Sequence, residues 1–316
     1  MRIAVMAAGG VGGYFGARLA QAGHEVAFCA RGRHLAAIRE RGLTVRSAGG
    51  DIHLAKVVAS DDPESLGRFD LVLFAVKLWD TEAAAAASLP LIAGGGMVIP
   101  FQNGVESIER VGAVIGEPWV LGGAAYIAAT IAEPGVILHT GQMARLRFGP
   151  VLPAQQGPAS RFLKACVDAG IDADLVADVR CVLWEKFVFL SAFSGVTSAT
   201  RQPIGAIRSD PDLRAILEAA MGEAFAVGRA RRVALAEELV GQQMVLVDGL
   251  PAEMKSSMLN DLVSGNRLEA PWLSGAVARM AMQSGLSAPV SATLYATVKP
   301  FCDGTSRRQP SEEKQR

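Results

Sequence analysis

A run of small residues, Ala7-Ala8-Gly9-Gly10-Val11-Gly12, follows an apolar stretch of strand length and opens a helical segment. The dinucleotide-binding fingerprint Gly-x-Gly-x-x-Gly occupies such a strand–turn–helix position, where the positive end of the helix holds a pyrophosphate. Gly9 and Gly12 fill its second and third glycine positions, and Ala7 stands at the first. The residues expected to bind a cofactor are Gly9, Gly10, Val11 and Gly12. A structural glycine-rich turn is the alternative.

The next apolar run, Glu25–Cys29, is soon followed by Arg31. An NAD-binding chain usually carries Asp or Glu about 20 residues after the glycine loop, where it holds the ribose 2′-hydroxyl. A guanidinium instead pairs with a 2′-phosphate through two charge-assisted hydrogen bonds. Arg31, with Arg33 close by, therefore predicts NADP (NADPH) as the cofactor. The alternative is two surface arginines at the start of a helix.

Lys186 lies in an otherwise apolar and aromatic segment that contains Trp184, Phe187, Phe189 and Phe193. Charged residues are rarely buried without a reason. When a hydride adds to a ketone carbon, the resulting alkoxide must be protonated, and a partly desolvated lysine is a suitable general acid. Lys186 is therefore a candidate proton donor. The alternative is a lysine whose ammonium group reaches solvent at the domain edge.

The first 150 residues alternate strand-like apolar runs with helical segments. The runs are Ile3–Met6, Glu25–Cys29, Leu71–Val76 and Met97–Phe101, and the helical segments are Gly12–Ala22, His34–Arg41 and Thr81–Leu89. This alternation predicts an α/β domain of the Rossmann type, with a doubly wound parallel sheet. Lys77 and Asn103 follow two of these strands, at the edge where open α/β sheets bind ligands. An ordinary surface lysine and an Asn-Gly turn are the alternatives.

Further strand-like runs come next. Val120–Ala129, Val136–His139 and Arg145–Phe148, with a turn at Glu133-Pro134-Gly135, are expected to complete the sheet with antiparallel strands. After a loop at 152–160 and a short helix at Arg161–Ala169, Ile171–Val176 is expected as the last edge strand.

From about residue 178 the sequence changes to long helical segments. They are Asp178–Phe193, Asp212–Arg231, Ala236–Val247, Ala252–Leu262, Pro271–Ser284 and Val290–Val298, and glycine and proline mark the breaks between them. We therefore predict a dinucleotide-binding domain at 1–177, an all-α substrate and catalytic domain at 178–302, and a disordered tail at 303–316.

The composition excludes several classes of protein. The 316 residues have a net charge of zero, which does not indicate binding to nucleic acid. The four cysteines and four histidines show no metal-binding spacing, so neither a metal site nor a disulfide framework is expected. The first residues are already strand-like, and no apolar stretch is long enough to span a membrane. A cytoplasmic protein with reduced thiols is expected.

The sequence resembles the ketopantoate reductase (2-dehydropantoate 2-reductase) family over residues 1–300. The resemblance depends on the order and spacing of five motifs: Gly9–Gly13, Ala75-Val76-Lys77, Gln102-Asn103-Gly104, Leu183-Trp184-Glu185-Lys186-Phe187, and Ser256-Ser257-Met258 followed by Glu269. It implies NADPH-dependent reduction of ketopantoate to pantoate, a step of pantothenate biosynthesis.

The resemblance also implies roles for individual residues. Lys186 is the general acid, and Glu269 holds this lysine or the substrate hydroxyl. Asn103 lies near the nicotinamide and orients the reactants, and Lys77 lies beside cofactor and substrate. Ser257 contacts the substrate carboxylate. Without the resemblance, Glu269 would be read as a solvated carboxylate at a helix start, and Ser257 as a hydroxyl on a helix surface.

Two positions depart from the family pattern. Residues 190 and 194 share a helix face with Lys186, four and eight positions on, and the family usually has substrate-binding asparagines there. This chain has Leu190 and Ser194. We therefore also weigh a reductase of another, more apolar 2-oxo acid, and a non-catalytic NADP-binding sensor. The expected partner is a small-molecule 2-oxo acid, and a homodimer is compatible with the sequence.

Overall fold

The computed structural model describes residues 1–305, which form two compact units. The first unit is Met1–Leu183 and the second begins at Trp184. The division lies within helix α6 (Val179–Thr200). The boundary predicted after residue 177 lies slightly earlier, just before this helix begins. Of the tail expected to be disordered, residues 306–316 lie outside the described residues.

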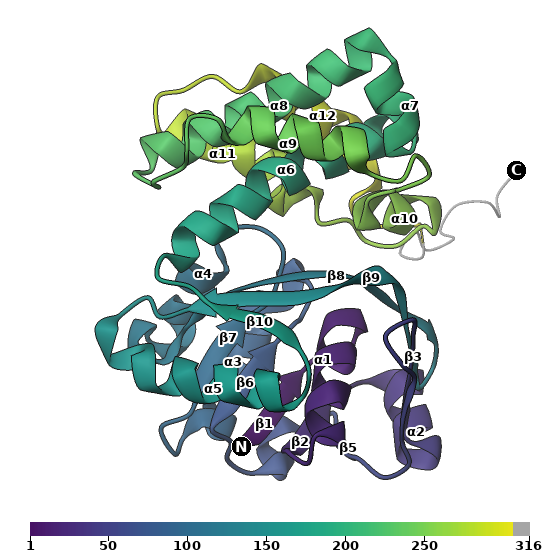
Figure 1. Ribbon diagram of the computed structural model, residues 1–316, viewed down its shortest axis with the longest axis vertical. Coiled ribbons are helices and arrows are strands. Elements are labelled where there is room, and N and C mark those ends of the chain that lie inside the picture. Colours follow the sequence, from purple (N-terminus) through teal and green to yellow (C-terminus); the bar gives the residue numbers. More distant parts are fainter. Residues whose placement is uncertain (306–316) are drawn as a thin grey trace, which may run out of the picture. The chain divides into compact units, whose positions relative to one another are not determined.

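The first unit contains the predicted parallel sheet (Figure 1). Its strands are β1 (Arg2–Met6), β2 (Glu25–Cys29), β5 (Val58–Ser60), β6 (Leu71–Phe74) and β7 (Met97–Pro100). They lie in the order β5-β2-β1-β6-β7, and every neighbouring pair is parallel. The connecting helices are α1 (Gly10–Gln21), α2 (Gly32–Arg41), α3 (Thr81–Ile92) and α4 (Ser107–Ile115). The prediction of an α/β Rossmann-type domain is confirmed.

The strands expected to complete this sheet form a second sheet instead. Its members are β3 (Leu43–Ser47), β4 (Ile52–Leu54), β8 (Gly122–Glu133), β9 (Val136–Gly149) and β10 (Asp172–Leu175), in the order β10-β9-β3-β4, with β8 on β9. An isolated bridge joins Val98 of β7 to Val120, which lies two residues before β8. The prediction of one sheet was wrong because β8 and β9 pair with each other as a long hairpin, and β9 gains its other neighbours from β3 and β10.

Other boundaries also differ from the predictions. Val136–His139 and Arg145–Phe148 are parts of one strand, β9. Strands β3, β4 and β5 were not predicted, because runs of three to five residues carry little periodic signal. Helix α5 (Gln156–Asp168) begins inside the predicted loop, since Pro158 falls in its first turn, where a missing N–H is tolerated. The expected edge strand is β10.

The second unit is helical throughout its regular structure, as predicted (Figure 1). After α6 come α7 (Ile204–Ser209), α8 (Pro211–Ala230), α9 (Leu239–Gly249), α10 (Ser257–Val263), α11 (Ser274–Gln283) and α12 (Pro289–Val298). The short 3₁₀ turns of both units are Pro63–Leu66, Leu78–Asp80, Glu117–Trp119, Pro153–Gln155, Ala270–Trp272 and Lys299–Phe301. Within residues 1–305, no helix has the length and hydrophobicity needed to cross a membrane.

The turn after β1 contains a strained residue. Ala7 has φ +76°, in the left-handed region where a Cβ meets the following carbonyl oxygen. This conformation costs a residue other than glycine about 1–2 kcal/mol. The chain therefore lacks the first glycine of the dinucleotide fingerprint, but Ala7 at that position has the positive φ that glycine adopts easily.

We expect Ala7→Gly to stabilise the protein. The variant removes about 1–2 kcal/mol of strain and loses about 0.4–1 kcal/mol to the greater freedom of the unfolded chain. The expected net gain is about 0.8 kcal/mol, seen as a higher urea midpoint at constant m-value. Ala8→Gly, at a buried neighbour without a positive φ, is the control and should lower the midpoint. A lower midpoint for Ala7→Gly would show that the turn is not strained.

Candidate functional site

Four predicted cofactor-binding segments follow adjacent strands of the parallel sheet. Arg31 follows β2, the glycine loop follows β1, Lys77 follows β6 and Asn103 follows β7. Because these strands are parallel neighbours in the order β2-β1-β6-β7, the four segments lie in the same order along the carboxyl edge. The direction of strand succession reverses between β1 and β6, and ligands of open α/β sheets bind at such a point.

The glycines of the loop differ in their surroundings. A Cβ at Gly12 would overlap the Ala7 carbonyl oxygen and lie 2.8 Å from Val5 Cγ1, so only glycine allows this approach of α1 to β1. A Cβ at Gly10 would overlap the Ala129 carbonyl oxygen of β8. At Gly9, the residue before α1, a Cβ would meet nothing within 4 Å. Gly9 is thus the point where backbone faces open space at a helix N-terminus, which suits an anion.

Arg31 is exposed and lies at the N-cap position of α2, directly beyond the end of β2. Arg33, in the first turn of the same helix, is also exposed. Burial raises the pKa of the nearby Cys29 thiol to about 12, and the positive charge of Arg31 opposes this rise. The end of β2 therefore presents positive charge to solvent, where the adenosine side of a dinucleotide would lie.

Gln102, the residue before Asn103, holds the segment that contains Lys77 from both sides. The sequence analysis treated this glutamine only as part of a motif. It is buried, and its Nε2 donates to the Val76 carbonyl at 3.0 Å and to Thr81 Oγ1 at 2.9 Å. These bonds join the end of β6, the start of α3 and the end of β7. Lys77 is exposed, with its Nζ 5.7 Å from the centre of the Trp79 ring. Asn103 is partly buried.

In the second unit, Lys186 and Glu269 interact electrostatically. Burial lowers the pKa of Lys186 to about 8, and the negative charge of Glu269 opposes this fall. The helix around Lys186 is anchored by aromatic packing: Trp184 and Phe187 make an edge-to-face contact with centroids 5.4 Å apart. Gln243 of α9 donates to the Glu185 carbonyl at 2.6 Å. The lysine is thus held in an apolar setting beside a carboxylate.

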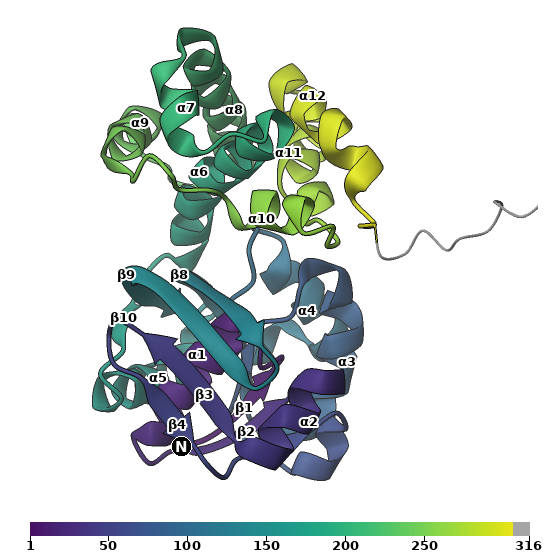
Figure 2. The same cartoon turned by 90° about the vertical axis from the view of Figure 1, so that its right-hand side faces the viewer.

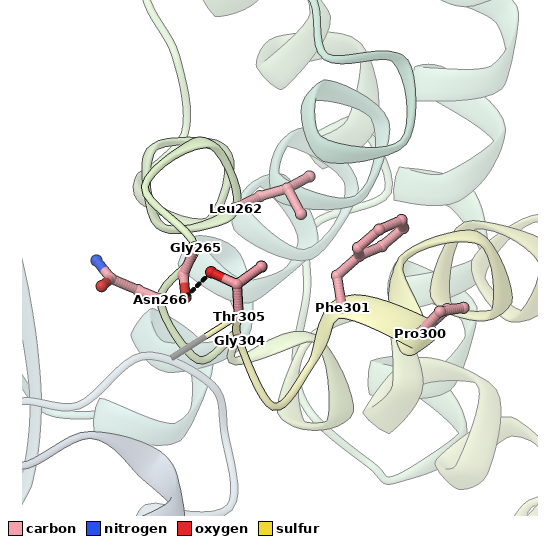
Figure 3. Close-up of a pocket in the computed structure, with 7 residues that line it drawn as sticks. All are labelled: Leu262, Gly265, Asn266, Pro300, Phe301, Gly304 and Thr305. Atoms are coloured by element: carbon pink, nitrogen blue, oxygen red, sulfur yellow. Dashed lines mark hydrogen bonds between the residues drawn. The ribbon is translucent and has the colours of Figure 1, made fainter. Parts of the chain in front are cut away.

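Glu269 is buried, and backbone contacts hold the segment before it. The Leu268 N–H donates to the Cys302 carbonyl at 2.9 Å, and the Thr305 N–H donates to the Gly265 carbonyl at 3.0 Å. A pocket of about 110 Å³ lies where these two segments meet, and Figure 3 shows the residues around it. Its lining residues are Leu262, Gly265, Asn266, Pro300, Phe301, Gly304 and Thr305. It is small beside the roughly 300–1,000 Å³ of ordinary ligand sites, and no predicted site residue lines it.

The paired serines of the Ser256-Ser257-Met258 motif have different surroundings. Ser256 is buried and is the N-cap of α10: its Oγ accepts from the Leu259 N–H at 3.0 Å. It also forms a 2.7 Å hydrogen bond with Thr197 Oγ1 of α6. Ser257, the predicted substrate contact, is the first residue of α10 and is exposed. Ser256 therefore positions the start of α10, and with it Ser257, relative to α6. The sequence signal that could have indicated this role is a serine at the position before a helix.

The two departures from the family pattern lie on α6. Leu190 is partly buried, while Ser194 is completely buried. Among residues 1–305, Ser194 Oγ has no hydrogen-bond partner. The structure brings Leu190 and Ser194 onto the helix that carries Lys186, as their spacing predicted.

Comparisons with known proteins agree with this arrangement. Residues 3–153 match the family model described as ketopantoate reductase PanE/ApbA, and residues 178–301 match its C-terminal model. A 2-dehydropantoate 2-reductase of Halobacterium salinarum is 30% identical, with 95% of this chain and 98% of that protein covered. The crystal structure of a PanE/ApbA family ketopantoate reductase from Ralstonia eutropha has a TM-score of 0.87 at 32% identity, covering 95% and 98% of the two chains.

A solved structure of lower sequence identity has the same fold. The ternary structure of D-mandelate dehydrogenase with NADH and anilino(oxo)acetate has a TM-score of 0.88 at 19% identity, covering 95% of this chain and 98% of that one. At this identity the likeness concerns the fold alone. Two family models that together span most of the sequence, and relatives similar over nearly their full length, decide the classification: the chain belongs to the ketopantoate reductase family.

Proposed function

We propose that this protein is an NADPH-dependent 2-dehydropantoate 2-reductase. The observation that carries the proposal is Lys186, whose pKa is lowered to about 8 beside the buried carboxylate Glu269. A general acid works best when its pKa lies near the working pH. Relatives named 2-dehydropantoate 2-reductase suggest the substrate.

The carboxyl edge of the parallel sheet suits NADPH. Gly9 offers open backbone at the start of α1 for the pyrophosphate, with Gly10, Val11 and Gly12 forming the first turn. Arg31 would pair with the 2′-phosphate. Lys77 and Asn103, beyond the reversal of strand order, would lie toward the nicotinamide end. When bound, the cofactor supplies a hydride to the keto carbon.

Lys186 supplies the proton that completes the reduction. As the carbonyl becomes an alkoxide, the lysine Nζ donates a proton to this oxygen and becomes a neutral amine. With a pKa of about 8, the lysine is mostly protonated at neutral pH yet gives up its proton more readily than an exposed lysine. Glu269 keeps the ammonium form available by opposing the effect of burial. Asn103 would orient the reactants, and Ser257 would bind the substrate carboxylate.

The cofactor assignment predicts a selective effect of Arg31→Ala. Losing a charge-assisted hydrogen-bonding partner costs about 1.5–3 kcal/mol, which is about 10- to 150-fold in affinity. Calorimetric titration should show this loss for NADPH and little change for NADH, with NADPH preferred by the wild type. Arg39→Ala, on the same helix and paired with Asp61 at 3.6 Å, is the control. Equal losses for both cofactors would remove Arg31 from the 2′-phosphate site.

The proton-donor assignment predicts how the pH dependence responds to Glu269→Gln. The rate of ketone reduction should fall above about pH 8 as Lys186 loses its proton. Removing the Glu269 charge lowers the pKa of Lys186 further, so this alkaline limb should move to lower pH. Lys186→Ala should lose about 10²- to 10⁴-fold in kcat while NADPH still binds. The control Lys164→Ala changes an exposed lysine paired with Asp168. An unmoved limb in Glu269→Gln would assign the proton to another group.

Leu190 favours a second candidate, a reductase of a more apolar 2-oxo acid. Ketopantoate has a terminal hydroxyl that needs a partner when it leaves water, and an unpartnered buried hydroxyl costs about 1–3 kcal/mol. Leu190 offers no hydrogen bond, and the Ser194 hydroxyl is fully buried. NADPH oxidation measured against a panel of 2-oxo acids, with and without a hydroxyl, separates the two candidates. No oxidation with any of them would favour a cofactor-binding sensor.

The second candidate predicts the effect of Leu190→Asn. The amide should raise kcat/KM for ketopantoate relative to a 2-oxo acid that lacks the hydroxyl, by about 5- to 150-fold. Leu190→Met, which keeps an apolar side chain of similar volume, is the matched control and should leave the ratio unchanged. If the wild type already strongly prefers ketopantoate, or if the asparagine variant leaves the ratio unaltered, other residues bind the hydroxyl.

A further inference from the structure

His34 joins two segments that lie far apart in the sequence. It is in the first turn of α2 and is partly buried. Its Nε2 lies 2.9 Å from the carbonyl oxygen of Ala8, in the glycine loop. Its Nδ1 accepts a hydrogen bond from the Gly135 N–H at 3.0 Å, in the turn between β8 and β9. One imidazole therefore connects the loop, helix α2 and the hairpin turn.

The two partners determine the state of the ring. The Gly135 N–H can only donate, so Nδ1 must carry a lone pair, and the Ala8 carbonyl can only accept, so Nε2 must carry the hydrogen. Only the neutral Nε2–H tautomer makes both bonds. Protonation of Nδ1 would set two donors against each other. Burial lowers the pKa of His34 below its usual 6.5, an effect that the bond to Ala8 opposes, so the ring is neutral at pH 7.

His34 bonds to the loop directly beside its strained residue. Ala8 follows Ala7, the residue with φ +76°. The hairpin runs alongside α1, and its turn reaches α2 (Figure 2). A Cβ at Gly135 would lie 3.2 Å from Ala37 Cβ of α2, and one at Gly10 would overlap the backbone of β8. The hairpin thus packs against α2 at Gly135 and against the first residue of α1 at Gly10, next to the open backbone at Gly9.

We propose that His34 is a positioning residue for the dinucleotide loop, and that its neutral ring holds the loop in the cofactor-binding conformation until acidic pH breaks the bond to Gly135. The proposal rests on the proposed function only in taking a nicotinamide dinucleotide as the ligand of the loop. His34 acts through Ala8 and not by touching the cofactor. Cofactor affinity therefore falls as the ring gains a proton, below pH 6.5.

The elements around His34 carry other charged groups, which all remain in variants at residue 34. They are Arg31 at the N-cap of α2, Arg33, Arg39, Glu40 and Arg41 of α2, Asp61 and Asp62 after β5, Glu133 at the end of β8, and Arg46 of β3, which pairs with Glu133 at 3.7 Å. A pH response that disappears when only His34 is replaced therefore belongs to the histidine. The 2′-phosphate of the ligand also titrates, with a second pKa of about 6.

Three variants separate the two hydrogen bonds. His34→Gln places an amide near Nε2 and keeps a donor for Ala8, His34→Asn places an amide near Nδ1 and keeps an acceptor for Gly135, and His34→Phe removes both. None of the replacement side chains titrates. The exposed His53, whose Nδ1 is 3.0 Å from Thr44 Oγ1, provides the control His53→Gln.

Calorimetric titration with NADP⁺ and with NAD⁺ from pH 5 to 8 tests the proposal, because NAD⁺ lacks the titrating phosphate. We expect wild-type affinity for both ligands to fall about tenfold between pH 7.5 and 5, and the three variants to lose this dependence for NAD⁺. At pH 7.5, His34→Phe should bind about 3- to 30-fold more weakly, and the single-bond variants should lie between. Affinity that rises at acidic pH in the wild type alone would make His34 a direct phosphate ligand and overturn the proposal.

Amide hydrogen exchange in the protein without cofactor provides an independent readout. The Gly135 amide should be protected at pH 7.5 in the wild type and in His34→Asn, and should exchange faster in His34→Phe and His34→Gln. Protection that does not depend on His34 overturns the proposal even if cofactor binding is normal. Failure of both dinucleotides to bind, with Gly135 protected through His34, would instead reject the proposed function and leave the loop without its assigned ligand.

Discussion

The close packing of α1 between two sheets is the constraint on which the cofactor side of the molecule depends. Gly12 and Gly16 let the helix approach the parallel sheet, where their hydrogens face Val5 and Phe28. Gly10 and Gly13 let β8 and β9 approach the opposite side, at Ala129 and Ile137. Any side chain at these four positions would push one sheet away. The start of α1, and with it the open backbone at Gly9, can occupy only one place relative to the strand ends.

The sequence predicted this region well because its signals are local. Buried parallel strands appear as short apolar runs, and the residue after each run falls at the carboxyl edge. Arg31, Lys77 and Asn103 could therefore be placed from their spacing alone. The second sheet could not be predicted, since the pairing of β9 with β3 joins residues about 90 positions apart and leaves no periodic trace. Likewise, nothing near His34 in the sequence indicates Gly135 as its partner.

In the helical unit, too, the sequence indicated local surroundings but not the contacts between distant segments. The apolar surroundings of Lys186 were visible in the sequence, and they account for the lowered pKa. Its interaction with Glu269 was not visible, because Glu269 lies in a separate segment before the turn Ala270–Trp272 and only the family resemblance linked the two residues. The roles of Ser256 and Gln102 also depend on tertiary contacts, with Thr197 and Thr81 as partners. Each of these polar side chains connects elements that are separated in the sequence, and local sequence patterns give no information on such contacts.

The backbone bonds between residues 265–268 and 302–305 have a consequence for how the pair of Lys186 and Glu269 is assembled. Lys186 lies on α6, near the start of the helical unit, whereas the segment before Glu269 is held by a turn at 302–305, near the end of the described residues. The interaction between this lysine and this carboxylate therefore depends on contacts that span the whole helical unit, so that the pair is completed together with the fold of that unit.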